Sequence, residues 1–449
     1  MRKERYTDIL QTIAGIIKNT QWENHVYAVG GCVRDELMGN DIKDIDMCID
    51  LPGGGIRFAQ WLYNQHLTKG KPVVYPTYGT AMFRLKQFPR HELECVQTRK
   101  EKYTDIRSRN PETAFGSLEE DCMRRDLTIN SLYRNISTGE LLDLTGNGLD
   151  DIKGHLIRTT ATPDIIFDDD PLRILRCIRF ATRFGWPIDR DTCQGMKKNA
   201  FRLEIITHER IRDEWDKMLT CAYPVQAMQW LQEIGAMHYV VPELVPVCQQ
   251  GLVDKEGCSL WNETLKVMEK MESDSLVMRM AAVLRALGSR KTPYSCPSAD
   301  LLATIMVRLR YSTEIIRQVQ FLVTHLGMTD NWKEDLSLME PADLRRLQYC
   351  CQTEERFSRL MLLTDAVNQV RTGEGYMPRQ VRNILQRTEL MKEEGTAMFG
   401  YKLPVTGHDV MEILHITPGP LVRSCLDRLM EMAFIQPVRS KEEWLALLC

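Results

Sequence analysis

Residues 27–35 read YAVGGCVRD, and residues 43–49 read KDIDMCI. The first segment has the pattern of a short strand, a tight glycine turn and the start of a helix. Gly30 and Gly31 carry no side chain, so the backbone can approach a phosphate closely, and amides at a helix start favour anions. On its own, a Gly-Gly pair is also compatible with a plain turn.

The second segment places two carboxylates in a predicted strand. Because strand side chains alternate between faces, Asp44 and Asp46 are predicted to project from the same side. An isolated pair could lie on a solvated edge beside lysines. Since this pair follows the glycine turn, we interpret it as a ligand set for divalent metal ions that bridge triphosphate oxygens and activate a hydroxyl. Glu94 is a candidate third carboxylate, although Glu92 has the same parity and either could be an exposed strand residue.

A third cluster lies at residues 121–130, which read DCMRRDLTIN. Arginines suit phosphates, while Asp and Asn side chains suit sugar hydroxyls, so Arg125, Asp126 and Asn130 are candidate nucleotide-binding residues. In isolation, an Arg-Arg-Asp sequence would be a surface ion-pair cluster in most proteins.

A helix is predicted to begin within residues 168–180, which read DDDPLRILRCIRF. Asp170 is a good N-cap residue, and Pro171 suits the first turn. At about 100° per residue, the apolar side chains share one face of this helix. A second face carries Arg173, Arg176, Arg179 and Arg183. Capping and solvation would account for these residues. A sharper interpretation is that Asp170 and Arg173, one turn apart, offer an acceptor and a donor to a nucleobase edge.

The composition indicates an ordinary soluble protein with several domains. The chain has 449 residues, of which 43% are hydrophobic and 27% charged, whereas single cores rarely exceed roughly 300 residues. No apolar run suits a membrane span or signal peptide, so we expect a cytoplasmic protein without membrane contact. The net charge of −3 requires any RNA partner to be held by a local basic surface. The 14 cysteines include no CxxC pair, which argues against a zinc ribbon or disulfide framework.

The pattern of the chain changes from α/β to helical. Short β-rich runs occur over about the first 150 residues, and helical periodicity dominates from about residue 170 onward. The predicted strands lie at residues 27–29, 46–49, 81–85 and 93–96. The predicted fold class is therefore α+β, with a small sheet domain followed by helices.

Taken in order, the four clusters resemble the class II tRNA nucleotidyltransferases, which are the CCA-adding enzymes and bacterial poly(A) polymerases of the polymerase-β-like superfamily. The agreement covers about residues 20–220 and is looser beyond them. The resemblance implies a mixed-sheet nucleotidyltransferase head, a helical neck, a helical body and a tRNA-binding helical tail. Their expected ranges are 1–150, 151–225, 226–345 and 346–449.

The resemblance also implies roles for single residues. Asp44 and Asp46 match the metal ligands, and Glu94 matches the third catalytic acid. In the family, the glycine turn contacts the triphosphate, an Arg-Asp motif recognises the ribose, and an Asp and an Arg of the neck pair with the incoming base. The expected nucleotide-binding residues are Gly30, Gly31, Arg34, Arg125, Asp126, Asn130, Asp170, Arg173, Arg176 and Arg179.

Two further segments resemble family features. Residues 209–214 resemble the neck motif that supports the base-reading helix. Residues 98–111 resemble the flexible loop of full CCA-adding enzymes, and their polar, proline-terminated composition is also that of a mobile loop. The loop favours full CCA addition over CC addition.

The activity implied is template-independent addition of CCA to the 3′ end of tRNA from CTP and ATP, with a two-metal Mg²⁺ site and release of pyrophosphate. The expected partners are the tRNA acceptor end, held by basic residues of the neck and tail, and nucleoside triphosphates; no protein partner is implied. The alternatives are a poly(A) polymerase, a CC- or A-adding enzyme, and a catalytically silent tRNA-binding relative.

Residues 252–325 resemble the histidine-aspartate hydrolase domain of some bacterial relatives. Asn262 stands where that family has its His, and Arg285-Ala286 replaces the His-Asp pair. A cation and a methyl group cannot ligate a divalent metal in place of imidazole and carboxylate. We therefore expect a structural body without hydrolase chemistry.

Overall fold

The computed structural model divides into two compact units, Met1–Val240 and Val241–Cys449. The structure describes residues 6–42, 44–102, 112–249, 259–271, 275–288, 298–330, 339–373 and 379–448. The boundary between the units falls inside the predicted body, and the finer division into four parts stays a prediction.

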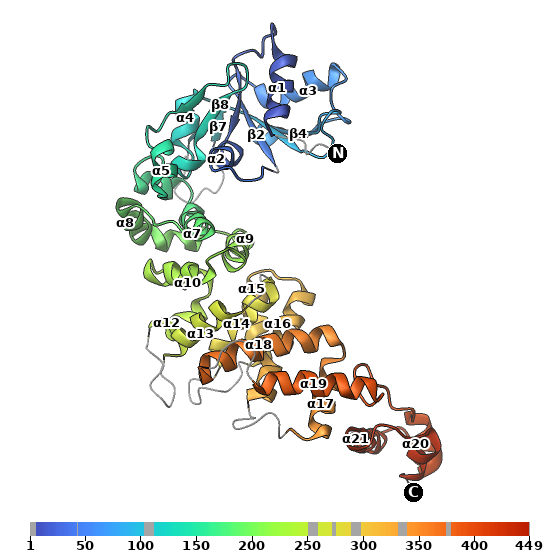
Figure 1. The fold of residues 1–449 in the computed structure, drawn as a ribbon. Helices are drawn as coiled ribbons and strands as arrows, with labels where there is room; N and C mark the ends of the chain where they lie inside the picture. The colour runs from blue at the N-terminus through green and yellow to red at the C-terminus, as the bar shows by residue number, and fades with distance from the viewer. Residues whose placement is uncertain are drawn as a thin grey trace. The chain divides into compact units, whose positions relative to one another are not determined.

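A seven-stranded mixed sheet forms the core of the first unit (Figure 1). The strand order is β3-β4-β5-β2-β1-β8-β9, and only the β2–β5 pair is parallel. The strands are β1 (Val26–Val29), β2 (Ile45–Ile49), β3 (Val73–Tyr75), β4 (Thr80–Phe83), β5 (Leu93–Gln97), β8 (Leu132–Asn135) and β9 (Leu141–Asp143). The four strands predicted from the sequence are present, and the predicted fold class is confirmed.

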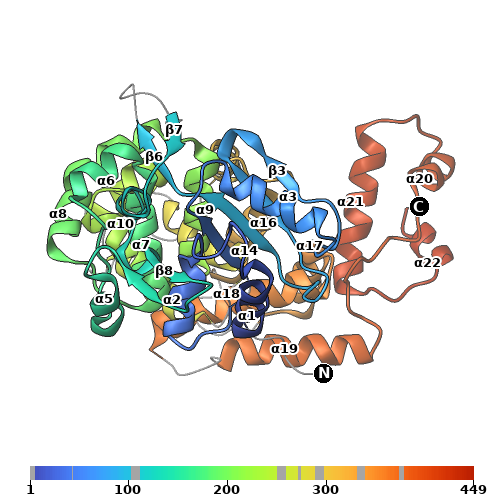
Figure 2. The same cartoon turned by 90° about the horizontal axis from the view of Figure 1, so that it is seen from above.

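Side-chain alternation gives this sheet one apolar face and one mixed face. Helices α1 (Tyr6–Ile17) and α3 (Gly54–Asn64) pack their apolar side chains into the core on the apolar face, and Figure 2 shows them at separate places along the sheet. The resulting core includes Ile9, Ile13, Ile17, Phe58, Ile45, Met47 and Cys95. Asp46 and Glu94 alternate with these core residues, so the packing of the apolar face directs both carboxylates to the other face.

Further α-helices complete the first unit. They are α2 (Gly31–Leu37), α4 (Leu118–Met123), α5 (Gly148–Gly154), α6 (Pro163–Asp169), α7 (Leu172–Phe184), α8 (Arg190–Asn199), α9 (His208–Leu219), α10 (Pro224–Glu233) and α11 (Met237–Val240). Helix α7 packs against α9 and α10. It begins at Leu172 with Pro171 in the N-cap position, so the predicted cap at Asp170 was one residue too early. The Asp170 carboxylate still caps the helix, because it accepts a hydrogen bond from the Leu172 N–H at 3.1 Å.

Helices also build the described part of the second unit. They are α12 (Val245–Gln249), α13 (Leu260–Lys270), α14 (Leu276–Leu284), α15 (Ala299–Arg308), α16 (Thr313–Asp330), α17 (Pro341–Cys351), α18 (Glu354–Thr372), α19 (Arg379–Glu393), α20 (Gly407–Leu414), α21 (Pro420–Ile435) and α22 (Lys441–Ala446). Figure 2 shows the last three gathered around the C-terminus, where Val410, Phe434 and Trp444 share a core. The apolar stripes of α13 and α14 are buried, as their periodicity predicts.

Part of the predicted flexible loop is regular structure. Arg99–Lys102 form strand β6, which pairs with β7 (Glu112–Phe115). The loop prediction was wrong for these residues because the pairing, together with a hydrogen bond from the Arg99 N–H to Asp121, fixes their backbone. Residues 103–111 of the predicted loop lie outside the described residues.

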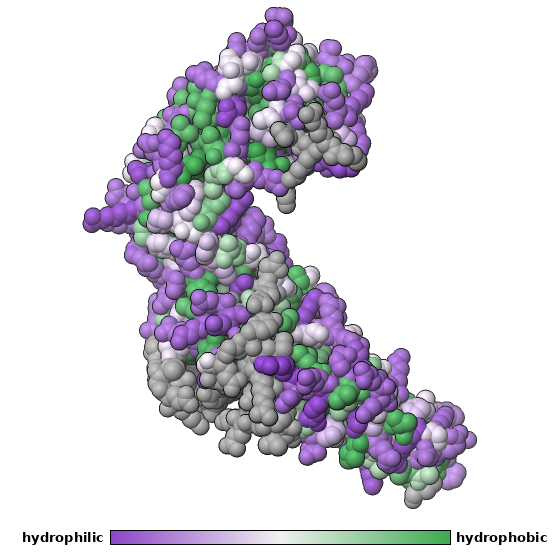
Figure 3. Space-filling view, in the orientation of Figure 1, coloured by the Kyte–Doolittle hydropathy of each residue, from purple (hydrophilic) through white to green (hydrophobic). Residues whose placement is uncertain are grey.

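Within the described ranges, no helix is long and apolar enough to cross a membrane. Hydrophilic side chains cover most of the described surface on the face drawn in Figure 3. The cytoplasmic location stays a prediction.

Candidate active site

The glycine turn connects β1 to α2. Gly30 has a φ of +77°, which side-chain-bearing residues rarely adopt, and its N–H donates to the Leu132 carbonyl at 3.3 Å. A Cβ atom on Gly30 would lie 3.7 Å from Nη1 of Arg125. The turn therefore brings bare backbone next to an arginine of the third cluster, as a phosphate-contacting turn requires.

Two of the three predicted acids lie side by side. Asp46 on β2 is in register with Glu94 on the parallel strand β5, and strands lie about 4.8 Å apart. Asp44 precedes β2, which begins at Ile45, so the alternation argument does not apply to it. Loss of hydration raises the pKa of Asp46, Arg125 opposes that rise, and Asp44 adds to it. Desolvation also raises the pKa of Glu94, and the charge of Asp46 raises it further.

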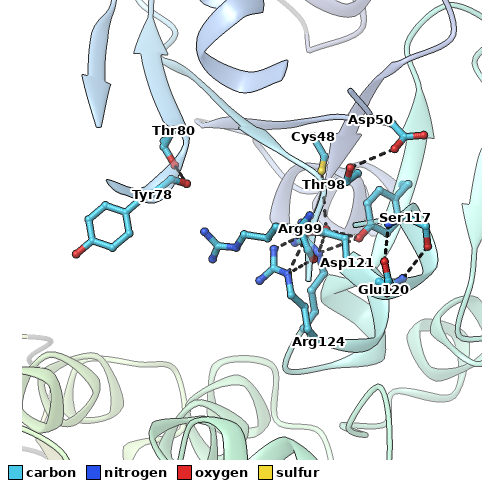
Figure 4. Close-up of polar contacts among 12 residues, drawn as sticks. Cys48, Asp50, Tyr78, Thr80, Thr98, Arg99, Ser117, Glu120, Asp121 and Arg124 are labelled. Atoms are coloured by element: carbon cyan, nitrogen blue, oxygen red, sulfur yellow. Dashed lines mark hydrogen bonds and ion pairs between the residues drawn. The ribbon is translucent and has the colours of Figure 1, made fainter. Parts of the chain in front are cut away.

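Asp46 and Glu94 line a pocket of about 560 Å³ on the mixed face of the sheet. Its remaining walls come from three arginines and several apolar or aromatic residues. The lining residues are Val29, Asp46, Met47, Tyr75, Tyr78, Thr80, Met82, Glu94, Val96, Arg99, Arg124 and Arg125. Figure 4 shows Tyr78 and Thr80 on one side and the group around Asp121 and Arg124 on the other. The pocket thus combines acids suited to cations with arginines suited to phosphates.

Asp121 holds two of the pocket arginines in place. Its carboxylate is fully buried and contacts Arg124 at 2.6 Å, Arg125 at 3.0 Å and the Tyr133 hydroxyl at 2.6 Å. Burial alone would raise the pKa of Asp121, but the two guanidinium groups hold it well below its usual range. The arginine pair is therefore a built wall around one buried carboxylate, with a net positive charge, and not the solvated surface cluster of the alternative interpretation.

A chain of polar contacts runs from the glycine turn to helix α7. Arg34 donates to the Asn130 Oδ1 at 2.5 Å, and the Asn130 amide donates to Asp126 at 3.3 Å. Asp126 in turn accepts from Nε of Arg176 at 2.7 Å. Arg34 is only 2% exposed and also pairs with Asp35 at 2.8 Å. These contacts show Arg34, Asp126 and Asn130 positioning one another.

The arginine face of α7 is engaged with protein groups. Arg179 pairs with the buried Glu214 of α9 at 2.5 Å and lies over the Phe180 ring at 4.1 Å. Asp170 pairs with Arg210 of α9 at 2.7 Å. Solvation therefore does not explain this face, and residues 209–214 support α7 as the motif resemblance implied.

The predicted base-reading pair is only partly presented to solvent. Arg173 is 8% exposed, donates to the Ile166 carbonyl at 3.1 Å and lies 3.7 Å from Asp169. Neither Asp170 nor Arg173 lines the pocket of Asp46 and Glu94. The structure places the pair on one helix start but does not join it to the carboxylates.

No group of three or more His, Cys, Asp or Glu side chains is arranged to hold a metal among the described residues. Mg²⁺ does not require such a group, because it keeps several waters and uses one or two carboxylates together with substrate phosphates. Asp46 and Glu94, which line one pocket and lie in register on neighbouring strands, are a donor set of that kind. The residues present fit the predicted cation.

The eroded hydrolase motif holds an ion cluster. Glu263 on α13 accepts from Arg285 at 3.3 Å and from Arg371 of α18 at 3.1 Å. Asn262 is exposed, and Ala286 is buried. Two guanidinium groups thus engage the Glu263 carboxylate, which lies next to the substituted position Asn262.

Sequence reasoning missed several residues of the pocket. Arg99 lay in the predicted loop, and Tyr75, Tyr78 and Met82 carry no motif. Strand parity named Glu94 and Glu92 alike, and the structure places Glu94 in the pocket, while its role as third acid stays a prediction. Asp121 could have been suspected from its spacing of three and four residues to Arg124 and Arg125.

Two segments match known family models. Residues 26–158 match the poly A polymerase head domain, and residues 185–248 match the probable RNA and SrmB-binding site of polymerase A. The tRNA nucleotidyltransferase cca1 of Schizosaccharomyces pombe is 26% identical over 490 residues, which cover 95% of this chain and 91% of that protein. Residues 26–158 belong to the poly A polymerase head-domain family. The metal-binding and nucleotide-binding roles, residue by residue, remain predictions.

Further family members agree with this assignment. The mitochondrial CCA tRNA nucleotidyltransferase of Saccharomyces cerevisiae is 35% identical over 223 residues, 45% of this chain, and the match spans 40% of that protein's length. The Bacillus stearothermophilus CCA-adding enzyme, solved in complex with CTP, superposes with a TM-score of 0.70 at 21% identity. That superposition covers 99% of this chain and 97% of the other, so the family fold extends through both units.

Proposed function

We propose that this nucleotidyltransferase adds CCA to the 3′ end of tRNA, using CTP and ATP. The observation that carries the proposal is the pocket in which Asp46 and Glu94 face Arg99, Arg124 and Arg125. Such a pocket suits a cation-bound triphosphate, since acids bind the cation and arginines bind phosphate oxygens. The names of the S. pombe and S. cerevisiae relatives support tRNA as the acceptor.

Asp44 and Asp46 would hold two Mg²⁺ ions, with Glu94 as the adjoining acid. Mg²⁺ bound there would lower the pKa of the RNA 3′-hydroxyl and neutralise the leaving pyrophosphate. The arginines held by Asp121 would orient the triphosphate for in-line attack. Because positioning and charge stabilisation supply most of the catalysis in such transfers, no protein nucleophile is needed.

Asp170 and Arg173 would read the incoming base. For this role, Arg173 must exchange its hydrogen bond to the Ile166 carbonyl for one to the base. The Asp170–Arg210 pair anchors the helix start from outside during that exchange. The Arg176–Asp126 contact would couple the position of helix α7 to Asp126, the proposed ribose-binding residue.

Incorporation assays with each single NTP and with all four test the proposal. A tRNA lacking its CCA end should gain two cytidines and one adenosine, and generic RNA should remain unextended. A poly(A) polymerase, which the matching head-domain model also describes, would instead extend generic RNA with ATP alone. Absence of any incorporation would support the silent tRNA-binding alternative.

A further inference from the structure

A second groove adjoins the active-site pocket on the same face of the sheet. Its volume is about 400 Å³, and it is lined by Lys69, Gly70, Lys71, Val73, Tyr75, Met82, Phe83, Arg84 and Glu92. Tyr75 and Met82 line both cavities. The two cavities are therefore neighbours that share a wall.

Strand register shows how the groove is connected to the carboxylates. Asp46 is in register with Glu94, Glu94 with Met82, and Met82 with Val73. This row crosses four strands, so it spans three interstrand spacings, roughly 14 Å at about 4.8 Å each. A path thus leads from the acids, over Met82, to the edge strand β3.

The chemistry changes along that path. Val73 and Tyr75 on β3 and Tyr78 just beyond it are 54%, 44% and 61% exposed, which is high for large apolar side chains. Beyond them lie Lys69 and Lys71, both exposed and without an ion-pair partner in the part of the chain that the structure describes. Arg84 pairs with the one acid of the groove, Glu92, at 3.0 Å. Three cations thus face one carboxylate.

Exposed aromatic rings followed by cations form the arrangement that binds single-stranded nucleic acid, in which bases stack and phosphates lie along a basic groove. The triphosphate has its own cations, Arg99, Arg124 and Arg125, in the first pocket. We infer that the Lys69–Lys71–Tyr75 groove holds the single-stranded 3′ segment of the RNA acceptor. A base would stack on Tyr75, the upstream phosphates would lie along the lysines, and the 3′-hydroxyl would reach Asp46. This inference rests on the proposed function, because it assigns that reaction's acceptor strand.

The test compares four variants of the full chain with wild type, one of them the conservative Tyr75→Phe. Lys69→Ala/Lys71→Ala removes the two free cations, and Tyr75→Ala removes the ring. Lys18→Ala/Lys153→Ala is the charge-matched control, because both lysines are exposed residues of the same unit outside either cavity. Binding of a labelled acceptor-stem RNA ending in a single-stranded 3′ segment is followed by fluorescence anisotropy over a series of salt concentrations. The KM values for RNA and CTP are measured separately.

The lysine pair variant should bind RNA with a weaker salt dependence. The slope of log K against log salt concentration should fall in magnitude by about 1.4, because each of two lost phosphate contacts contributes about 0.7. Tyr75→Ala should weaken RNA binding and raise the KM for RNA about fivefold or more, whereas Tyr75→Phe should match wild type. The KM for CTP should stay within twofold in the lysine pair variant and in the control, whose residues lie outside the active-site pocket. Unchanged RNA binding, or a rise confined to the KM for CTP, would overturn the inference. Failure of the proposed function would show itself differently, as wild-type protein that incorporates no nucleotide.

Discussion

Arg176 of helix α7 contacts the buried carboxylate of Asp126 twice, at 2.7 Å from Nε and at 2.6 Å from Nη2. Asp126 lies next to the arginine wall of the pocket, so this ion pair joins that wall to the helix that carries Asp170 and Arg173. Burial would raise the pKa of Asp126, but Arg176 lowers it to about 2.

Arg176→Ala should therefore destabilise the first unit in a pH-dependent way. It leaves a buried carboxylate without its cation, which should cost about 2 kcal/mol near neutral pH, below the cost in a fully buried pair because Arg176 is partly exposed. A carboxyl group whose pKa is lowered in the folded state stabilises the folded protein at pH values above its unfolded-state pKa. That stabilisation is lost as the pH falls through the folded-state pKa. The difference from wild type should shrink between pH 4 and pH 2, the window bounded by 3.8 and about 2. Denaturant unfolding at several pH values checks this, and a pH-independent difference would contradict it.

Asp44→Ala and Asp46→Ala should each abolish nucleotide addition. Loss of a metal ligand removes the charge stabilisation on which phosphoryl transfer depends. Binding of tRNA should stay within a few fold, because basic surfaces elsewhere hold the RNA. Single-turnover assays at saturating Mg²⁺ measure the effect, and undiminished turnover by either variant would refute the metal assignment.

Glu94→Gln and Glu92→Gln form a matched pair on neighbouring positions of equal parity. Glu94 lines the pocket beside Asp46, whereas Glu92 pairs with Arg84 at the strand edge. We expect Glu94→Gln to lower kcat at least tenfold, of the order seen when one charge-stabilising group is removed, and Glu92→Gln to leave kcat within twofold. Equal effects of the two substitutions would remove Glu94 from the catalytic set.

Arg173→Ala should reduce discrimination among nucleoside triphosphates. A bidentate base contact contributes roughly 1 to 3 kcal/mol, so the preference for CTP and ATP over UTP and GTP should fall about 5- to 150-fold. Arg183→Ala, an exposed arginine on the same helix, is the control. Thermal melts must accompany the kinetics, since Arg173 also holds the Ile166 carbonyl. Retention of wild-type preference would exclude base reading by Arg173.

The Glu263 cluster predicts that the second unit has no hydrolase activity. Its acid is occupied by Arg285 and Arg371, so 2′,3′-cyclic nucleotides and p-nitrophenyl phosphate should not be cleaved with Ni²⁺, Mn²⁺ or Mg²⁺. Arg285→Ala should lower stability by about 1 kcal/mol, because Arg371 still pairs with the Glu263 carboxylate after the substitution. Hydrolysis that persists in an Asp44→Ala/Asp46→Ala double variant would reveal a second metal site.

The sequence was sufficient to predict the elements that have a strong local signal. Strands β1, β2, β4 and β5 are short β-rich runs, and α7 has an apolar face at helical spacing, so each was predicted near its observed position. Strand β6 reads Arg-Lys-Glu-Lys and exists only because β7 pairs with it, which no local pattern reveals.

The chemistry of the site was harder to predict than its location. The sequence indicated Asp46 by its position after the glycine turn and Glu94 by the family resemblance, but the burial of Asp121 depends on arginines and a tyrosine that fold around it. The engagement of Arg173, Arg176 and Arg179 by protein acceptors likewise depends on tertiary packing. Residue type and spacing show which groups are available, and only packing shows which of them are already paired.

The strand order of the sheet has a consequence for synthesis on the ribosome. Val29, which precedes the glycine turn, pairs with Tyr133, and Asp46 pairs with Glu94, so neighbours in the site are distant along the chain. A nascent chain that has not yet exposed β8 leaves β1 with an open edge, and the arginine wall has no Tyr133 hydroxyl to hold it. The catalytic pocket therefore cannot be complete until about a third of the polypeptide has emerged.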